Sequence, residues 1–155
     1  MSQQVARGEA ELVINGEGAI LGRLASYVAK RLLEGKKVVI VNAEKVAVSG
    51  DPVRVKQYYK QLILSVRSHY SDKWRPKRAR SPQRLVRKAI KGMLPKNNRG
   101  AEALRRLRVF VGVPKEYQGR QPLTLPEDMT VKKLTRTKYV TLGEIAKELG
   151  WRGGA

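Results

Sequence analysis

The sequence predicts an α/β fold built on a small parallel sheet, and two observations support this prediction. A strand-like segment, a helix with one apolar face and a second strand-like segment follow one another within residues 11–42. The second of these strands is apolar on both faces, which is typical of a central strand covered on two sides. A strand–helix–strand order favours a parallel pair, because the helix carries the chain back to the edge where the first strand began.

The first strand is predicted over residues 11–14, before an Asn-Gly turn. The helix that follows is predicted from apolar residues that recur at intervals of three and four and so share one face. Gly35 ends this helix. The β-branched run KVVIVN at residues 37–42 then predicts the second strand. The apolar face of the helix is assigned to Leu21, Leu24, Ala25, Val28 and Leu32.

A second helix is predicted with Asp51 as its N-cap and Pro52 at its first position. Residues 46–48, just before it, are expected to continue the preceding strand briefly. Residues 67–80 contain no Leu, Ile or Val, so we expect them to form an extended basic loop and not a part of the core. The buried stripe of the second helix is assigned to Tyr59, Leu62, Ile63 and Val66.

A third helix is predicted to begin at Ser81 and Pro82 and to end at Pro95. Its polar and apolar residues separate onto opposite faces, because each set recurs at intervals of three and four. The polar face is entirely basic. It carries Arg84, Arg87, Lys88 and Lys91, and the opposite face carries Val86, Ala89, Ile90 and Met93.

The last third of the chain is predicted to contain short elements. A basic helix is expected over residues 101–108, with Leu104 and Leu107 directed inward, and a strand over residues 109–113. Residues 114–138 are expected to be largely irregular, because they are rich in Pro, Gly and Gln.

Near the C-terminus, residues 138–140 are expected to be extended, and a capping box at residues 141–144 predicts a final helix that Gly150 ends. The inward residues of this helix are Leu142, Ile145, Ala146 and Leu149. No repeat and no long linker divides the sequence. We therefore predict a single domain over residues 1–155, with residues 1–10 as a flexible arm.

The charge of the chain is concentrated in one stretch. Residues 67–108 contain fifteen Lys or Arg and two acids, and so carry thirteen of the chain's twenty net positive charges. Charge of this density raises the energy of a compact fold unless an anionic partner neutralises it. A polyphosphate does so and releases condensed counterions when it is bound. The stretch therefore predicts binding to nucleic acid, and to folded RNA in particular.

Composition excludes several other classes of protein. The high pI points to nucleic acid first and to an acidic membrane surface second. No apolar run approaches the roughly eighteen residues needed to span a bilayer. We predict no membrane partner. Cysteine is absent, which excludes disulfides and thiolate metal sites and favours the cytosol. His69 is the one histidine in the sequence, so the chain offers few residues for a metal site or for a histidine-based catalytic triad.

The third helix and the loop before it supply the candidate RNA-binding residues. Solvated helix faces usually alternate acids with bases, whereas Arg84–Lys88 and Arg87–Lys91 are like-charged pairs at i and i+4. The loop interleaves rings, on which unpaired bases stack, with cations that contact phosphates. The alternative for Trp74 is a structural role, in which its side chain packs against the core. The loop candidates are Arg67, His69, Tyr70, Lys73, Trp74, Arg75, Lys77, Arg78 and Arg80.

A rival hypothesis comes from the glycines at positions 16, 18 and 22, which stand between a strand and a helix. This resembles a turn that holds the pyrophosphate of a dinucleotide, although the spacing differs from the usual G-x-G-x-x-G. Asn42 and Glu44 stand near the place of a ribose-binding acid. The hypothesis is a nucleotide-dependent enzyme, and the alternative is a tight structural turn. A general DNA-binding protein is a third hypothesis.

The motif IKGMLPKN at residues 90–97 resembles the signature of the large-subunit ribosomal protein L-thirteen family. GRLA at residues 22–25, VIVNA at residues 39–43 and VFVG at residues 109–112 follow the family pattern in order, and the resemblance covers about residues 12–150. The compact length and the Arg-Ser-Pro sequence before the third helix are similar to archaeal members. The loop at residues 68–80 lacks the glycine-rich stretch common in bacterial members.

The resemblance implies a three-layer α/β/α sandwich around a small parallel sheet, with a basic loop–helix extension. It also implies a structural constituent of the large ribosomal subunit in the cytoplasm, which binds large-subunit ribosomal RNA early in assembly, next to other large-subunit proteins. No enzymatic activity, cofactor or small-molecule substrate is implied. By family position, RNA contacts fall on the basic loop, on the basic face of the third helix, and on Lys96, Asn97 and Arg99.

Overall fold

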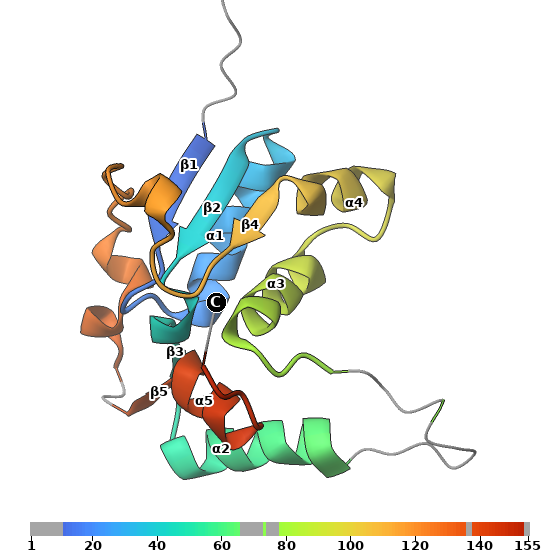
Figure 1. Ribbon diagram of the computed structural model, residues 1–155, viewed down its shortest axis with the longest axis vertical. Coiled ribbons are helices and arrows are strands. Elements are labelled where there is room, and N and C mark those ends of the chain that lie inside the picture. The colour runs from blue at the N-terminus through green and yellow to red at the C-terminus, as the bar shows by residue number, and fades with distance from the viewer. Residues whose placement is uncertain (1–10, 66–72, 74–77, 136–137, 154–155) are drawn as a thin grey trace, which may run out of the picture.

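The protein is represented by a computed structural model (Figure 1). The structure describes residues 11–65, 73, 78–135 and 138–153. Three strands form a parallel sheet in the order β1 (Glu11–Asn15), β2 (Lys37–Val41) and β4 (Leu107–Val109), with β2 in the centre. The predicted α/β class and the parallel pairing of the first two strands are confirmed.

The two faces of the sheet are buried against different parts of the chain. Ile14, Val38 and Ile40 are fully buried in the main core, together with residues of the helices. Val13, Val39 and Val41 point to the opposite face, where they pack with Tyr117. Because successive side chains of a strand alternate between faces, β2 has to be apolar at each of its buried positions, Val38 to Val41. This explains the continuous β-branched run.

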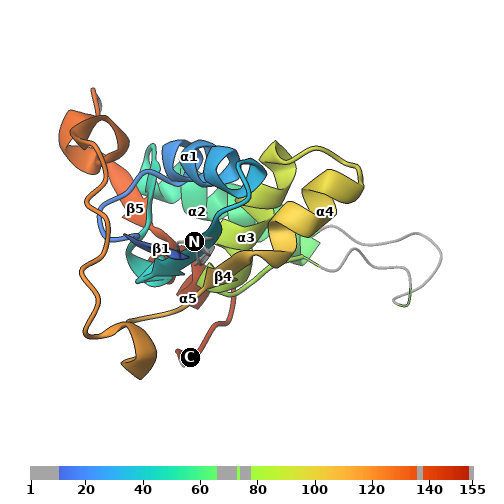
Figure 2. The ribbon, with the colours of Figure 1, turned by 90° about the horizontal axis from the view of Figure 1, so that it is seen from above.

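Helices α1 (Leu21–Leu33) and α3 (Pro82–Met93) pack against each other over the main core, and α4 (Asn98–Arg105) follows α3. Figure 2 shows α1, α3 and α4 on one side of the sheet and the short 3-10 helix Lys115–Tyr117 on the other. The third layer is thus an irregular segment with short 3-10 helices, as the Pro- and Gly-rich composition predicted. The predicted apolar stripe of α1 is confirmed at Leu24, Ala25, Val28 and Leu32.

A separate two-stranded sheet joins the middle of the chain to its C-terminal part. Strand β3 (Ala47–Ser49) pairs antiparallel with β5 (Tyr139–Thr141), and Val48 lies opposite Val140. The expectation that residues 46–48 continue the preceding strand was wrong. A 3-10 turn at Ala43–Lys45 redirects the chain, so β3 belongs to another sheet.

Helix α2 (Pro52–Lys60) continues into a π-helical turn at Gln61–Ser65 and lies beside α5 (Leu142–Glu148) (Figure 1). Ion pairs link the two helices, Lys56 to Glu144 at 3.7 Å and Lys60 to Glu148 at 2.6 Å. Ile63 is buried, whereas Tyr59 and Leu62 are half-buried and Val66 lies outside the described residues. Thr141 accepts a hydrogen bond from the Glu144 amide, as predicted, but the Asp51 side chain does not cap α2.

Four predictions around α3 and α4 need correction. The helix predicted over residues 101–108 begins at Asn98, because the Asn97 side chain caps it, and the next strand is Leu107–Val109 instead of 109–113. Ser81 does not cap α3 with its side chain. Met93, predicted to face inward, is 47% exposed, because Leu94 at the end of α3 turns into the core in its place.

In the described part of the chain, no helix is both long enough and apolar enough to cross a bilayer.

The connection between α3 and α4 is sterically constrained at Gly100. This glycine is buried, and a Cβ atom placed on it would lie 1.8 Å from the Pro95 carbonyl oxygen. A side chain therefore fits only if the backbone of the connection moves. Gly92, on the exposed face of α3, has no atom within 4 Å of the equivalent position.

We expect Gly100→Ala to lower the free energy of unfolding by about 3 kcal/mol, near the upper end of the usual range for overpacking. Gly92→Ala is the matched control. Because alanine favours helix more than glycine does, this variant should be unchanged or more stable by about 0.5–1 kcal/mol. Urea unfolding followed by circular dichroism measures both. Equal stability of the two variants would contradict the steric argument.

Candidate nucleic-acid interface

An open groove lies between α3 and α4, and we call it the α3–α4 groove. It has two adjoining parts of about 830 Å³ and about 540 Å³, which share Arg87, Lys91, Lys96 and Leu104. Among the described residues that line it, none is acidic. The cations that line it are Arg78, Arg84, Arg87, Lys88, Lys91, Lys96 and Arg105.

The cations of the groove are not neutralised by carboxylates of the described part of the chain. The described ion pairs lie elsewhere, and in three of them the cation hydrogen-bonds to the carboxyl and holds its pKa below the ordinary value. These are Glu34 with Arg31, Glu148 with Lys60, and Asp128 with Lys133. The acids that form the described ion pairs thus lie at other places, and the groove keeps its positive charge among the described residues.

The Arg87 side chain is held in place by the strand next to it. It is exposed, but its Nη1 atom lies 3.5 Å from the Leu107 carbonyl oxygen, to which it donates a weak hydrogen bond. The guanidinium carries five N–H donors, so four of them stay available to a ligand. Arg87 is one of three cations, with Lys91 and Lys96, that line both parts of the groove.

The structure brings together most of the described residues predicted to bind RNA. Lys73 is exposed in the basic loop, and Arg80 is exposed just before α3 without lining the groove. The residues that do line the groove are Arg78, Arg84, Arg87, Lys88, Lys91, Lys96 and Asn97. Outside the described residues are Arg67, His69, Tyr70, Trp74, Arg75 and Lys77.

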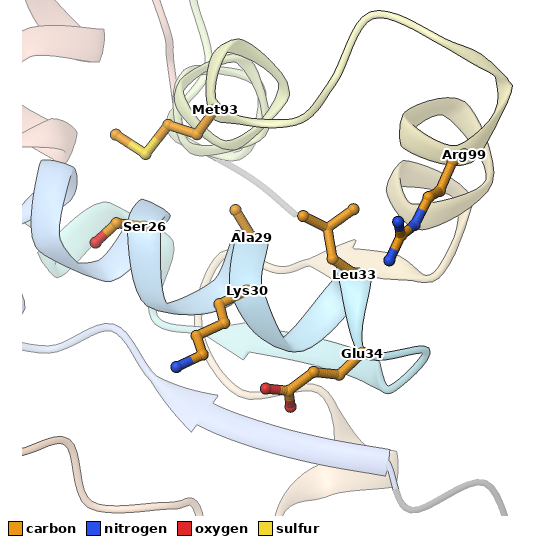
Figure 3. Close-up of a pocket in the computed structure, with 7 residues that line it drawn as sticks. All are labelled: Ser26, Ala29, Lys30, Leu33, Glu34, Met93 and Arg99. Atoms are coloured by element: carbon orange, nitrogen blue, oxygen red, sulfur yellow. The ribbon is translucent and has the colours of Figure 1, made fainter.

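Arg99 does not belong to the groove. It reaches from α4 toward Leu33 at the end of α1, in a separate pocket of about 490 Å³ (Figure 3). Met93 of α3 also lines this pocket, and so does Glu34, which is paired with Arg31. The charges around Arg99 are therefore mixed, unlike those of the α3–α4 groove.

Sequence reasoning did not identify Arg105 and Asn98 as groove residues. Asn97, Ala101, Leu104 and Arg105 line one face of α4, with the spacing of a helix. The spacing was visible in the sequence, but the predicted helix began too late to include Asn97 and Asn98.

Two polar residues of the basic stretch have structural roles. Asn97 accepts a hydrogen bond from the Gly100 amide at 3.0 Å and so caps α4. Arg106 donates from Nη2 to the Leu32 carbonyl oxygen at 2.8 Å, at the C-terminal end of α1. A cation at this end of a helix is favoured by the unpaired carbonyls there.

The glycine turn at residues 16–18 is engaged with the protein itself. The amides of five successive residues donate to internal acceptors, whereas a pyrophosphate site needs such amides free. A Cβ atom on Gly16 would lie 2.8 Å from Val46 Cγ2, which explains the glycine by packing. The acceptors for residues 16 to 20 are, in order, Val41 O, Asn15 Oδ1, Lys45 O, Gly16 O and Met129 O.

The two candidate ribose-binding residues also form hydrogen bonds within the protein. Asn42 donates to the Asn15 side chain at 3.0 Å, and Glu44 accepts from the Gly112 amide at 3.0 Å. The turn and its neighbours therefore serve the fold, as the structural alternative predicted.

A basic α/β frame with a positively charged groove is typical of nucleic-acid-binding proteins. The profile of the family described as Ribosomal protein L13 matches residues 9–116, and the chain belongs to this family. This confirms the resemblance seen in the motif at residues 90–97. The family is one of ribosomal structural proteins, so the chain is not an enzyme and the hypothesis of a nucleotide-dependent enzyme was wrong.

Several archaeal relatives are similar to the chain over nearly its full length. The large ribosomal subunit protein uL13 of Aeropyrum pernix is 54% identical over 152 residues, which cover 97% of both chains. The protein of the same name from Saccharolobus solfataricus is 47% identical, with 99% of this chain and 100% of the relative covered. That from Archaeoglobus fulgidus is 45% identical, with 94% and 92% covered. The prediction of an archaeal type is confirmed.

The neighbouring residues Asn97 and Asn98 allow a test of the capping role. Asn97→Ala should lower the free energy of unfolding by about 1 kcal/mol, because it leaves the Gly100 amide without its acceptor. Asn98→Ala should change it by less than about 0.5 kcal/mol, as for other exposed positions. Chemical denaturation of both variants in the absence of RNA gives the comparison. The capping role is refuted if the two changes are equally destabilising.

Proposed function

We propose that this protein is a structural constituent of the large ribosomal subunit in the cytoplasm. It binds large-subunit ribosomal RNA through the α3–α4 groove and the basic segment that leads into α3, and it stabilises the folded RNA during assembly. The single observation that carries the proposal is the groove, with seven cations and no acid among its described lining residues. The names of the relatives, all large-subunit proteins, support it. Neighbouring large-subunit proteins are its further partners.

The groove suits a polyphosphate for two physical reasons. Its cations come from α3, from α4, from the connection between these helices and from the segment before α3, and together they line one groove. Arginine accounts for four of the seven, and its planar guanidinium makes forked hydrogen bonds to phosphate oxygens. Each neutralised phosphate releases condensed counterions, so binding is favoured at low salt and weakens as salt rises.

The charge of the groove by itself does not distinguish RNA from DNA. The proposal names RNA because the chain belongs to a ribosomal family and because His69, Tyr70 and Trp74 supply rings for unpaired bases. Competition at equal salt between structured RNA and duplex DNA tests this choice. Preferential binding of duplex DNA would favour the hypothesis of a general DNA-binding protein instead.

Reversing three charges on α3 tests the groove directly. The variant Arg84→Glu, Arg87→Glu and Lys91→Glu should abolish association with large subunits while its circular dichroism stays unchanged. Its salt dependence should also fall. Three lost phosphate contacts remove about 0.7–0.9 each from the slope of log affinity against log salt. Sedimentation with large subunits and RNA titrations over a salt series measure these effects.

A control variant carries the same change of net charge at exposed cations outside the groove, namely Lys115→Glu, Lys132→Glu and Arg152→Glu. It should sediment with large subunits as the unmodified protein does. If both triple variants are equally impaired, net charge and not the groove controls binding. If neither is impaired, the assignment of the groove is wrong.

A further inference from the structure

The smaller part of the α3–α4 groove combines cations with apolar surface, as the larger part also does. It occupies about 540 Å³ where α3 turns into α4, and we call it the α4 pocket. Four cations stand around it, but several of its lining residues are apolar or lack a side chain. These are Leu94, Pro95, Gly100, Ala101 and Leu104.

An apolar lining favours a base over a phosphate. A phosphate gains nothing from apolar walls and loses its hydration there. A nucleobase has two apolar faces, which gain from contact with Leu104 and Ala101, and it has polar edges that need hydrogen-bond partners. Unpaired bases of RNA are the ones free to leave their stack and enter such a pocket.

We propose that the α4 pocket holds one unpaired nucleobase of RNA. The proposal rests on the proposed function, because the cations around the pocket then contact the phosphates on either side of that base. Arg87, Lys91 and Lys96 belong to both parts of the groove, so they lie where the backbone passes from the larger part into the pocket.

Polar groups for the edge of the base are also present. The amide of Asn98 lines the pocket and is exposed. The Oδ1 atom of Asn97 is engaged with the Gly100 amide, so Asn97 offers its NH2 group as a donor. Arg105 lines the same pocket and presents a planar group on which a base can stack.

The pocket is already formed in the protein without RNA. The Gly100 backbone lies directly against the Pro95 carbonyl, and the Asn97 cap fixes the start of α4. A pocket that is already formed loses little conformational entropy on binding, which favours affinity.

The test uses two RNA hairpins of equal length, one with a continuous stem and one with a single-uridine bulge. The unmodified protein should bind the bulged hairpin about tenfold more tightly, which is within the range for one stacked base. Ala101→Leu places a larger apolar side chain at the pocket and leaves every cation in place. It should lose the preference for the bulge while its affinity for the continuous stem and its salt dependence stay the same.

Val53→Leu on α2 is the control, because Val53 is 70% exposed, lies outside the groove and gains an apolar group without a change of charge. It should keep the preference for the bulge. Thermal unfolding of Ala101→Leu verifies that the variant is folded. Equal affinity of the unmodified protein for both hairpins overturns the base pocket and leaves the proposed function standing. An unchanged preference in Ala101→Leu also overturns it. Binding to neither hairpin contradicts the proposed function itself.

Discussion

The packing of α3 against α1 is the interaction on which the rest of the structure depends. Val86 and Ile90 are fully buried between α3, α1 and the sheet. Burying each such side chain contributes roughly 1.5–3 kcal/mol, whereas each like-charged pair on the outer face costs about 0.2–0.5 kcal/mol. The apolar face therefore decides how α3 docks, and the basic face is left to point outward. A helix without such an apolar face would not tolerate four uncompensated cations.

The connection after α3 turns this basic face into a groove. Leu94 enters the core at the end of α3, Asn97 caps the start of α4, and Gly100 in the first turn of α4 lies against the Pro95 carbonyl. These residues belong to the motif IKGMLPKN, or directly follow it. The motif that identifies the family thus fixes the placement of α4 next to the cations of α3. Its uncharged members set the geometry of the connection, whereas Lys91 and Lys96 supply two of the cations that line both parts of the groove.

The sequence predicted the parts of the fold that depend on periodicity. The stripe of α1, the two-sided apolar run of β2 and the two faces of α3 follow directly from spacing. The prediction from sequence failed for elements that are too short to show a periodic pattern of apolar residues. The start of α4 depends on a side-chain cap at Asn97, and β3 depends on a pairing partner almost a hundred residues away in sequence.

The sequence predicted the positive charge of the candidate site but not the exact set of residues that line the groove. The acid-free run from Arg78 to Ala101 was visible in the sequence, and it supplies most of the groove. That Arg105 joins the groove while Arg99 leaves it depends on the rotation of α4 about its own axis, which tertiary packing sets. Met93 illustrates the same limit, because a neighbouring leucine took the core position that helical spacing assigned to it.

The distribution of acids explains how so basic a chain folds before its partner is present. The described ion pairs lie at the α2–α5 contact, at the turn after β1, at the end of α1 and along the irregular segment, where they offset repulsion within the frame. The groove has no such compensation among the described residues, so its repulsion is relieved only by an anionic ligand. A ligand that binds the folded state alone stabilises that state by an amount that grows with the logarithm of the ligand concentration relative to Kd. Binding of a polyphosphate should therefore stabilise α3 more than the sheet, because α3 carries four of the seven cations that line the groove.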